Sequence, residues 1–133
     1  MYVEGRFVDP VMDHPPRILI ADDDPDLLEL LRDFLIGQGY EVAAVATGAE
    51  VLDAVVSIKP EVIVVDMVLP DLSGADVLAA LRRDGLTMPV ILISGHQIVV
   101  REGFFGAFRK PFHFRRLAEV VAAAVKQGRT SGG

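Results

Sequence analysis

The sequence predicts a doubly wound α/β fold, in which five parallel strands form one sheet with helices on both faces. Short apolar runs alternate along the chain with segments whose apolar residues recur at helical spacing. This alternation favours a parallel sheet, because each crossover carries a helix over one face of the sheet. The 133 residues, of which 51% are hydrophobic, suffice for one such domain with a single core.

The first strand is predicted over 17–21, an apolar run typical of a strand that is buried on both faces. Asp24 is of the residue type that caps helix N-termini, and Pro25 suits the first helical position. Apolar residues then follow at helical spacing until Gly37 and Gly39, which are expected to end the first helix.

The second strand is predicted over 40–45. Thr47 and Glu50 form a capping-box pattern, which opens a second helix that reaches about Ile58. The β-branched run 62–65 is the clearest strand in the chain.

Asp66 follows that third strand, at its carboxyl end. Ser73 is expected to cap a third helix that ends near Arg83. Asp66 is therefore placed where open parallel sheets bind their ligands, beyond the carboxyl ends of the strands.

A fourth strand is predicted over 89–93 and ends at Ser94, a weaker fifth strand follows over 104–109, and a last helix covers about 114–126. Residues 95–103 leave only nine positions between the fourth and fifth strands. A crossover that includes a complete helix needs about 10–12 residues. We therefore expect the fourth helix of the fold to be shortened or absent.

The domain is predicted over 17–127, between a flexible N-terminal leader, 1–16, and a flexible Gly/Ser tail, 128–133. We expect no effector domain after residue 127, so output is expected to pass through another protein. The chain shows no signal peptide and no apolar run long enough to span a membrane. It has no cysteine, which fits a cytoplasmic protein.

The formal net charge of −6 predicts no direct binding to nucleic acid, because phosphate backbones repel an acidic domain. No membrane partner is expected either.

The polar residues that follow the predicted strands indicate phosphate chemistry. These are the run 22–24, Asp66, Ser94 and Lys110. Several carboxylates in one crevice repel one another unless a cation binds between them, and Mg²⁺ prefers such hard oxygen ligands. A carboxylate can also attack phosphorus, while a lysine and a hydroxyl stabilise the phosphoryl oxygens.

Four motifs in this order resemble the response-regulator receiver family of bacterial two-component systems, over about residues 17–127. They are Ile18-Leu19-Ile20-Ala21-Asp22-Asp23-Asp24-Pro25-Asp26, Val65-Asp66-Met67-Val68-Leu69-Pro70-Asp71-Leu72-Ser73-Gly74, Val90-Ile91-Leu92-Ile93-Ser94-Gly95 and Lys110-Pro111-Phe112. The resemblance implies a flavodoxin-like receiver fold in a stand-alone, single-domain response regulator.

The resemblance also implies the metal ligands. Asp22 and Asp23 match the acidic pair that holds Mg²⁺, with Asp23 the more direct ligand. Asp66 binds the metal as well, and the backbone carbonyl of Val68 completes the shell.

Asp66 is further implied to be the phosphoacceptor, supplied by a histidine kinase or a histidine phosphotransfer protein. Ser94 and Lys110 engage the phosphoryl group, and the peptide bond before Pro111 is expected to be cis. By this resemblance the chain is no enzyme in the usual sense, but it assists its own phosphorylation and dephosphorylation. An unknown downstream protein receives the signal, and the chain is a monomer or a homodimer.

Two features depart from the family, the short connection at 95–103 and the switch aromatic. Ala107 lies three residues before the lysine, where the family has its switch aromatic, and Phe108 is expected to point to the other side of the strand. Val68 and His96 match the positions that line the path of the hydrolytic water. Val68 offers that water no side-chain hydrogen bond, so we expect slow loss of phosphate from Asp66.

Other interpretations remain open. Asp22 and Asp23 are also of the type that caps helices, and Ser94 and Lys110 suit a turn and a solvated surface. A second hypothesis is a phosphorylation-independent pseudo-receiver that acts as a binding module. A third is a phosphohydrolase of the haloacid dehalogenase type, for which 22–24 supplies the Asp-x-Asp motif only formally.

Overall fold

The computed structural model describes residues 2–3, 6–7, 14–99 and 101–131. Its main sheet has five strands in the order β4-β3-β5-β6-β7, and all neighbouring pairs are parallel. The doubly wound five-stranded parallel sheet is therefore confirmed. The strands are β3 Arg17–Ala21, β4 Glu41–Val45, β5 Val62–Asp66, β6 Val90–Ser94 and β7 Gly106–Arg109.

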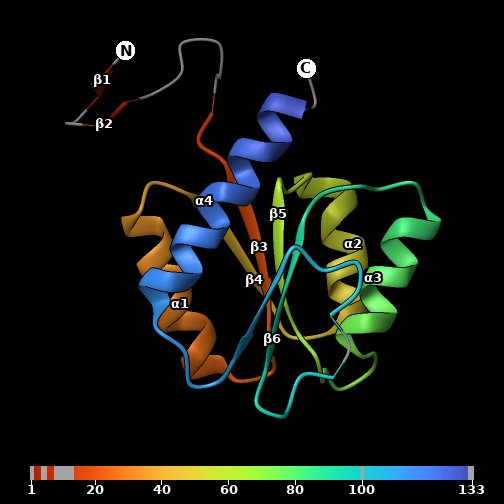
Figure 1. Cartoon of the computed structure of the whole chain (residues 1–133). Coiled ribbons are helices and arrows are strands. Elements are labelled where there is room, and N and C mark those ends of the chain that lie inside the picture. Colours follow the sequence, from red (N-terminus) through yellow and green to blue (C-terminus); the bar gives the residue numbers. More distant parts are fainter. Residues whose placement is uncertain (1, 4–5, 8–13, 100, 132–133) are drawn as a thin grey trace.

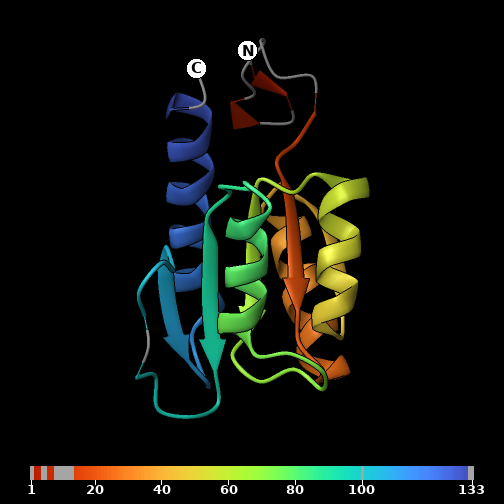
Figure 2. The ribbon, with the colours of Figure 1, turned by 90° about the vertical axis from the view of Figure 1, so that its right-hand side faces the viewer.

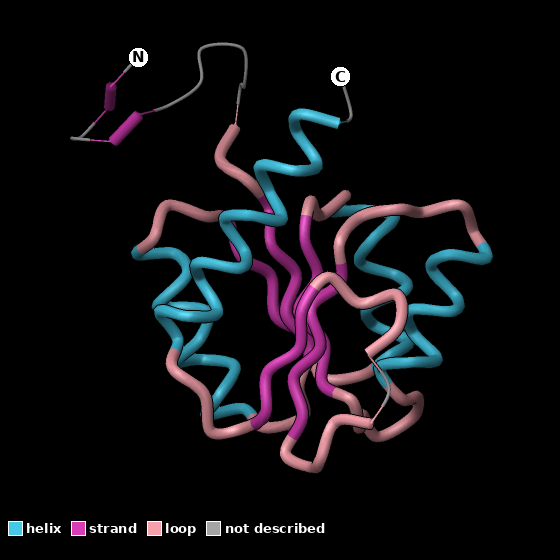
Figure 3. Tube along the Cα trace, in the orientation of Figure 1, coloured by secondary structure: helices cyan, strands magenta, loops and turns pink. Residues whose placement is uncertain are grey.

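Helices cover both faces of this sheet, so the domain has three layers (Figure 1; Figure 3). The helices are α1 Pro25–Gly37, α2 Gly48–Ile58, α3 Gly74–Arg83 and α4 Phe114–Ser131. α1 and α4 lie on one face, while α2 and α3 lie on the other (Figure 1). No helix among the described residues is both long and apolar enough to cross a membrane.

Strand β5 shows why the sheet needs both helix layers. Side chains alternate between the two faces of a strand. Val62 and Val64 accordingly pack into the core beneath α1 and α4, while Ile63 and Val65 pack into the core beneath α2 and α3. All four side chains are fully buried. A continuous β-branched run is the sequence that such a two-sided strand requires.

The predicted helix caps are present, with one difference. Asp24 caps α1 through the amides of Asp26 and Leu27, and Ser73 forms a complete capping box with Asp76. Thr47 accepts a hydrogen bond from the Glu50 amide, as predicted. The return half of that capping box is missing, because the Glu50 carboxylate instead binds the Thr47 hydroxyl and the amide of Ala46.

The expectation of a shortened or absent fourth helix holds for the connection between the fourth and fifth strands of the sheet, but it is wrong for the number of helices. The described residues form four helices, and the fourth in chain order, α4, has 18 residues. The short connection that prompted the expectation is the one between β6 and β7, and there none of the described residues, 95–99 and 101–105, is helical (Figure 2). The fifth strand is also shorter than predicted, because 104–105 precede β7.

Further secondary structure is described near both ends of the chain. Strands β1 Tyr2–Val3 and β2 Arg6–Phe7 pair antiparallel, while 1, 4–5 and 8–13 of the predicted leader lie outside the described residues. Helix α4 continues to Ser131, beyond its predicted end near Lys126. Arg129 donates two hydrogen bonds of 2.6 and 2.8 Å to Glu61, which anchors the last turns of α4 to the start of β5.

Candidate functional site

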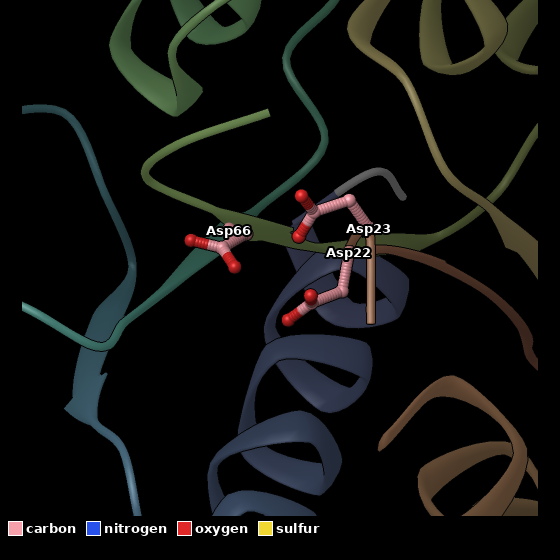
Figure 4. A group of neighbouring side chains, drawn as sticks. All are labelled: Asp22, Asp23 and Asp66. Atoms are coloured by element: carbon pink, nitrogen blue, oxygen red, sulfur yellow. The ribbon is translucent and has the colours of Figure 1, made fainter. Parts of the chain in front are cut away.

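The polar residues at the carboxyl ends of the strands lie together in the structure. Asp22 directly follows β3, Asp66 ends β5, Ser94 ends β6 and Lys110 directly follows β7. These four strands are consecutive neighbours in the sheet. Figure 4 shows the carboxylates of Asp22 and Asp66 at this edge beside that of Asp23.

The same local turn orients three of these side chains. Each side-chain oxygen accepts a hydrogen bond from the amide two residues further along, at 2.9 Å in Asp22, 3.0 Å in Asp66 and 3.0 Å in Ser94. Asp and Ser favour such turns, because their short side chains reach the local backbone. In both aspartates the turn occupies Oδ1, so Oδ2 is left for other partners.

Lys110 joins the two buried carboxylates. Its Nζ donates a hydrogen bond of 2.6 Å to Asp66 Oδ2 and lies 2.6 Å from Asp22 Oδ2. The second contact is an ion pair without hydrogen-bond alignment, so Asp22 Oδ2 is buried with no hydrogen-bond partner. Asp22 and Asp66 are only 1% and 5% exposed, and their charges therefore depend on this ammonium.

Burial and charge shift the pKa values of this group. Burial raises the pKa of Asp22 above its ordinary value, and the nearby charge of Asp66 adds to the rise, although Lys110 and the Asp24 amide oppose it. Burial lowers the pKa of Lys110, but its contacts with Asp22 and Asp66 outweigh that effect and raise the pKa overall. Lys110 therefore stays a cation at neutral pH.

Three carboxylates of this edge form a donor set for a cation. One oxygen each from Asp22, Asp23 and Asp66 lies within 4.8 Å of the others. Asp23 is exposed, whereas the other two are buried. The side chain of Asp24 caps α1 and does not belong to this set, which removes the support for an Asp-x-Asp nucleophile motif over 22–24.

The loop after Asp66 is folded tightly against the start of α3. Val68 pairs with Ser73 in an isolated antiparallel bridge, and the amide of Gly74 donates to the carbonyl of Met67 at 2.8 Å. A Cβ on Gly74 would lie 2.8 Å from the carbonyl oxygen of Asp66. Only a glycine therefore lets α3 approach the backbone of Asp66 this closely.

The aromatic residues near Lys110 divide between the two faces of the sheet. Ala107 packs on the side of α2 and α3, while Phe108 packs on the side of α1 and α4, which confirms the predicted opposite orientation. Phe104 lies on the same side as Ala107, whereas Phe105 lies with Phe108. The peptide bond between Lys110 and Pro111 is cis, as predicted.

Sequence reasoning missed Asp71. Its carboxylate accepts hydrogen bonds from the amides of Gly48 and Ala49, which are 23 and 22 residues away in the chain. A local pattern gives no signal for such a contact, because the partners belong to another element.

Sequence comparisons relate this chain to known proteins. The family model for the response regulator receiver domain matches residues 18–122. The DNA-binding response regulator MtrA of Mycolicibacterium smegmatis is 32% identical over 117 residues, which cover 84% of this chain and 51% of MtrA. The transcriptional regulatory protein KdpE of Mycobacterium tuberculosis is 46% identical over 77 residues, 58% of this chain and 34% of KdpE. The chain thus spans about half the length, or less, of these curated relatives.

Solved structures match over most of the chain. A CheY-like receiver domain protein from Methanospirillum hungatei has a TM-score of 0.82 at 26% identity, covering 88% of this chain and 98% of that one. The response regulator TrrA of Thermotoga maritima, solved in complex with Mg²⁺-BeF, has a TM-score of 0.75 at 27% identity. The match covers 82% of this chain and 98% of TrrA.

The close approach of Gly74 to Asp66 yields a first prediction. Gly74→Ala should lower the free energy of unfolding by about 1–3 kcal/mol, because the added methyl collides with a backbone oxygen that has to move. Urea denaturation measures this change. Gly37→Ala, at the end of α1, is the matched control, since its Cβ meets no atom within 4 Å. It should leave stability unchanged or raise it by up to about 1 kcal/mol. Equal effects of the two substitutions would contradict the described packing.

Proposed function

Because the chain belongs to the response regulator receiver domain family of two-component systems, we propose that it accepts a phosphoryl group on Asp66 from a histidine kinase or a histidine phosphotransfer protein. The single observation that carries this proposal is the contact of Lys110 with the carboxylates of Asp22 and Asp66 at the carboxyl ends of the strands. The chain then acts as an acceptor that assists its own phosphorylation and dephosphorylation, and not as an enzyme with a turnover of its own.

Asp66 is the nucleophile in this proposal. A carboxylate oxygen of Asp66 attacks phosphorus, a phosphorus–oxygen bond forms, and the bond between phosphorus and the histidine nitrogen of the donor breaks. Such a transfer needs alignment and charge stabilisation more than covalent assistance. The local turn at Val68 supplies alignment, since it holds Asp66 Oδ1 and leaves Oδ2 facing Lys110.

Lys110 and Ser94 stabilise the transferred group. Lys110 is a point cation beside Asp66, and its charge balances the phosphoryl oxygens as they approach. The hydroxyl of Ser94 accepts a hydrogen bond from the His96 amide and keeps its own proton for donation. With Ser94 only 1% exposed, that proton is available chiefly to a group bound at this edge.

The carboxylate set fits Mg²⁺. Asp22, Asp23 and Asp66 offer only hard oxygen donors, and buried Asp22 Oδ2 has no hydrogen-bond partner. In this proposal they hold the ion together with the backbone carbonyl of Val68. When bound, Mg²⁺ supplies positive charge that offsets the carboxylates and the phosphoryl oxygens.

The downstream step is a change in protein–protein contacts. MtrA is named a DNA-binding response regulator, but this chain matches only about half of it, and the receiver family model covers most of this chain. The absence of nucleic-acid binding by this domain stays a prediction, which the formal net charge of −6 supports. The choice between monomer and homodimer likewise stays open to measurement.

Phosphorylation by a small donor tests the proposed acceptor. Incubation with acetyl phosphate and Mg²⁺ should add one phosphoryl group to the wild-type chain, measured as intact-protein mass. Asp66→Asn should show no adduct, because an amide is a poor nucleophile. Asp53→Asn, which changes an exposed aspartate of α2 away from the site, should be labelled like the wild type.

An unlabelled wild type, under conditions that label a known receiver, contradicts the proposed acceptor. That result would favour the pseudo-receiver, a binding module whose site takes no phosphate.

The lifetime of the phosphoryl group depends on Val68 in this proposal. Its side chain is 54% exposed beside Asp66 and gives water no hydrogen bond. Val68→Asn should accelerate dephosphorylation by a factor of about 2–13, because one orienting hydrogen bond stabilises by roughly 0.5–1.5 kcal/mol. Decay of the phosphorylated mass over time measures the rate. Val56→Asn, an exposed position on α2, is the control, and an unchanged rate in Val68→Asn counts against this role.

A further inference from the structure

The loop that follows Asp66 is tied to another part of the domain by one side chain. This loop, residues 67–73, is called the acceptor loop below. Asp71 Oδ1 accepts a hydrogen bond of 2.7 Å from the amide of Gly48, and Oδ2 accepts one of 2.9 Å from the amide of Ala49. Asp71 Oδ1 also accepts from the amide of Leu72 at 2.9 Å, which orients the carboxylate within the loop.

The N-terminus of α2 receives two different caps. Thr47, the local N-cap, binds the amide of Glu50. Asp71 takes the amides of Gly48 and Ala49, which the local cap leaves without a partner. A carboxylate suits this end of a helix, because the helix dipole makes it positive. The two bonds to Ala49 and Gly48 lower the pKa of Asp71 below its ordinary value, so the carboxylate is ionised at neutral pH.

Close packing accompanies these hydrogen bonds. A Cβ on Gly48 would lie 2.8 Å from both Cβ and Cδ1 of Leu72. The glycine at the first position of α2 therefore lets the acceptor loop touch the helix. The other end of the loop is fixed by Gly74, whose amide binds the carbonyl of Met67 at 2.8 Å.

We propose that Asp71 is a positioning residue, whose carboxylate holds the acceptor loop against α2 and so keeps the backbone around Val68 in place beside the carboxylate set. The role toward the cation rests on the proposed function. The link that Asp71 makes between the acceptor loop and α2, called the clamp below, is present in the chain without any ligand. Asp71 is not one of the three carboxylates of the donor set, so in this proposal it acts through the backbone of the loop.

Two variants of Asp71 and one matched control test this role. Asp71→Ala removes both hydrogen bonds to α2, while Asp71→Asn keeps one acceptor oxygen. Thr47→Ala removes the other cap of the same helix without touching the acceptor loop. A purely structural role of Asp71 as a helix cap predicts the same behaviour for Asp71→Ala and Thr47→Ala.

Amide hydrogen exchange without Mg²⁺ gives the first readout. The amides of Leu69 and Gly74 are bound within the folded loop, to the carbonyls of Leu72 and Met67. Their exchange should be faster in Asp71→Ala, by about tenfold or more, and less affected in Asp71→Asn. In Thr47→Ala these two amides should exchange as in the wild type, while the Glu50 amide exchanges faster.

Mg²⁺ affinity gives the second readout, measured by titration of the full chain. Asp71→Ala should bind Mg²⁺ about 10–100-fold more weakly, as expected when a residue that supports the ligands is removed. The Mg²⁺ affinity of Asp71→Asn should fall between those of Asp71→Ala and the wild type. Thr47→Ala should bind Mg²⁺ like the wild type.

The outcomes separate the clamp from the proposed function. Unchanged exchange at Leu69 and Gly74 in Asp71→Ala overturns the positioning role, and so does a loss of Mg²⁺ affinity that Thr47→Ala shares. If the wild type itself binds no Mg²⁺, the proposed cation site fails, while the exchange comparison still decides whether Asp71 clamps the loop.

Discussion

The ion pairing of Lys110 with Asp22 and Asp66 is the interaction on which the site depends. Two carboxylates that are almost fully buried carry a large desolvation cost unless a cation lies between them. The order of the sheet provides that cation, because Lys110 follows edge strand β7 and reaches past β6 to β5 and β3. The carboxyl ends of β3, β5 and β7 are thereby joined through one ammonium group.

One ammonium does not balance the whole group. Asp22, Asp23 and Asp66 carry three formal negative charges against the single charge of Lys110, which leaves a formal −2 at one edge. Such an excess is unfavourable in the folded chain, and the divalent cation of the proposed function would offset it. Because local turns hold Asp22 and Asp66, two of the three carboxylates are fixed in place before any ligand arrives.

Most of this site could be predicted from the sequence, since parallel strands all point their carboxyl ends to one edge. Asp22, Asp66, Ser94 and Lys110 follow from that rule once the strands are found. Asp71 did not follow, because its partners lie on α2 and no local pattern links them. The sequence also predicts an end of α4 that is several residues too early, for a similar reason. The contact between Arg129 and Glu61, which holds the last turns of this helix, joins segments that are distant in the chain. Propensity and turn patterns depend on residues that are close in the chain, so they cannot predict contacts that form only in the folded domain.

The central claim, a carboxylate set that requires a divalent cation, is tested most directly by the dependence of stability on Mg²⁺. Urea unfolding of the wild type should show a free energy of unfolding higher by about 1.4 kcal/mol when free Mg²⁺ is about ten times its dissociation constant. At the same Mg²⁺ concentration, Asp22→Asn should gain far less, because the buried oxygen that has no hydrogen-bond partner has then lost its charge. An equal gain in both proteins, or no gain in the wild type, would contradict the account.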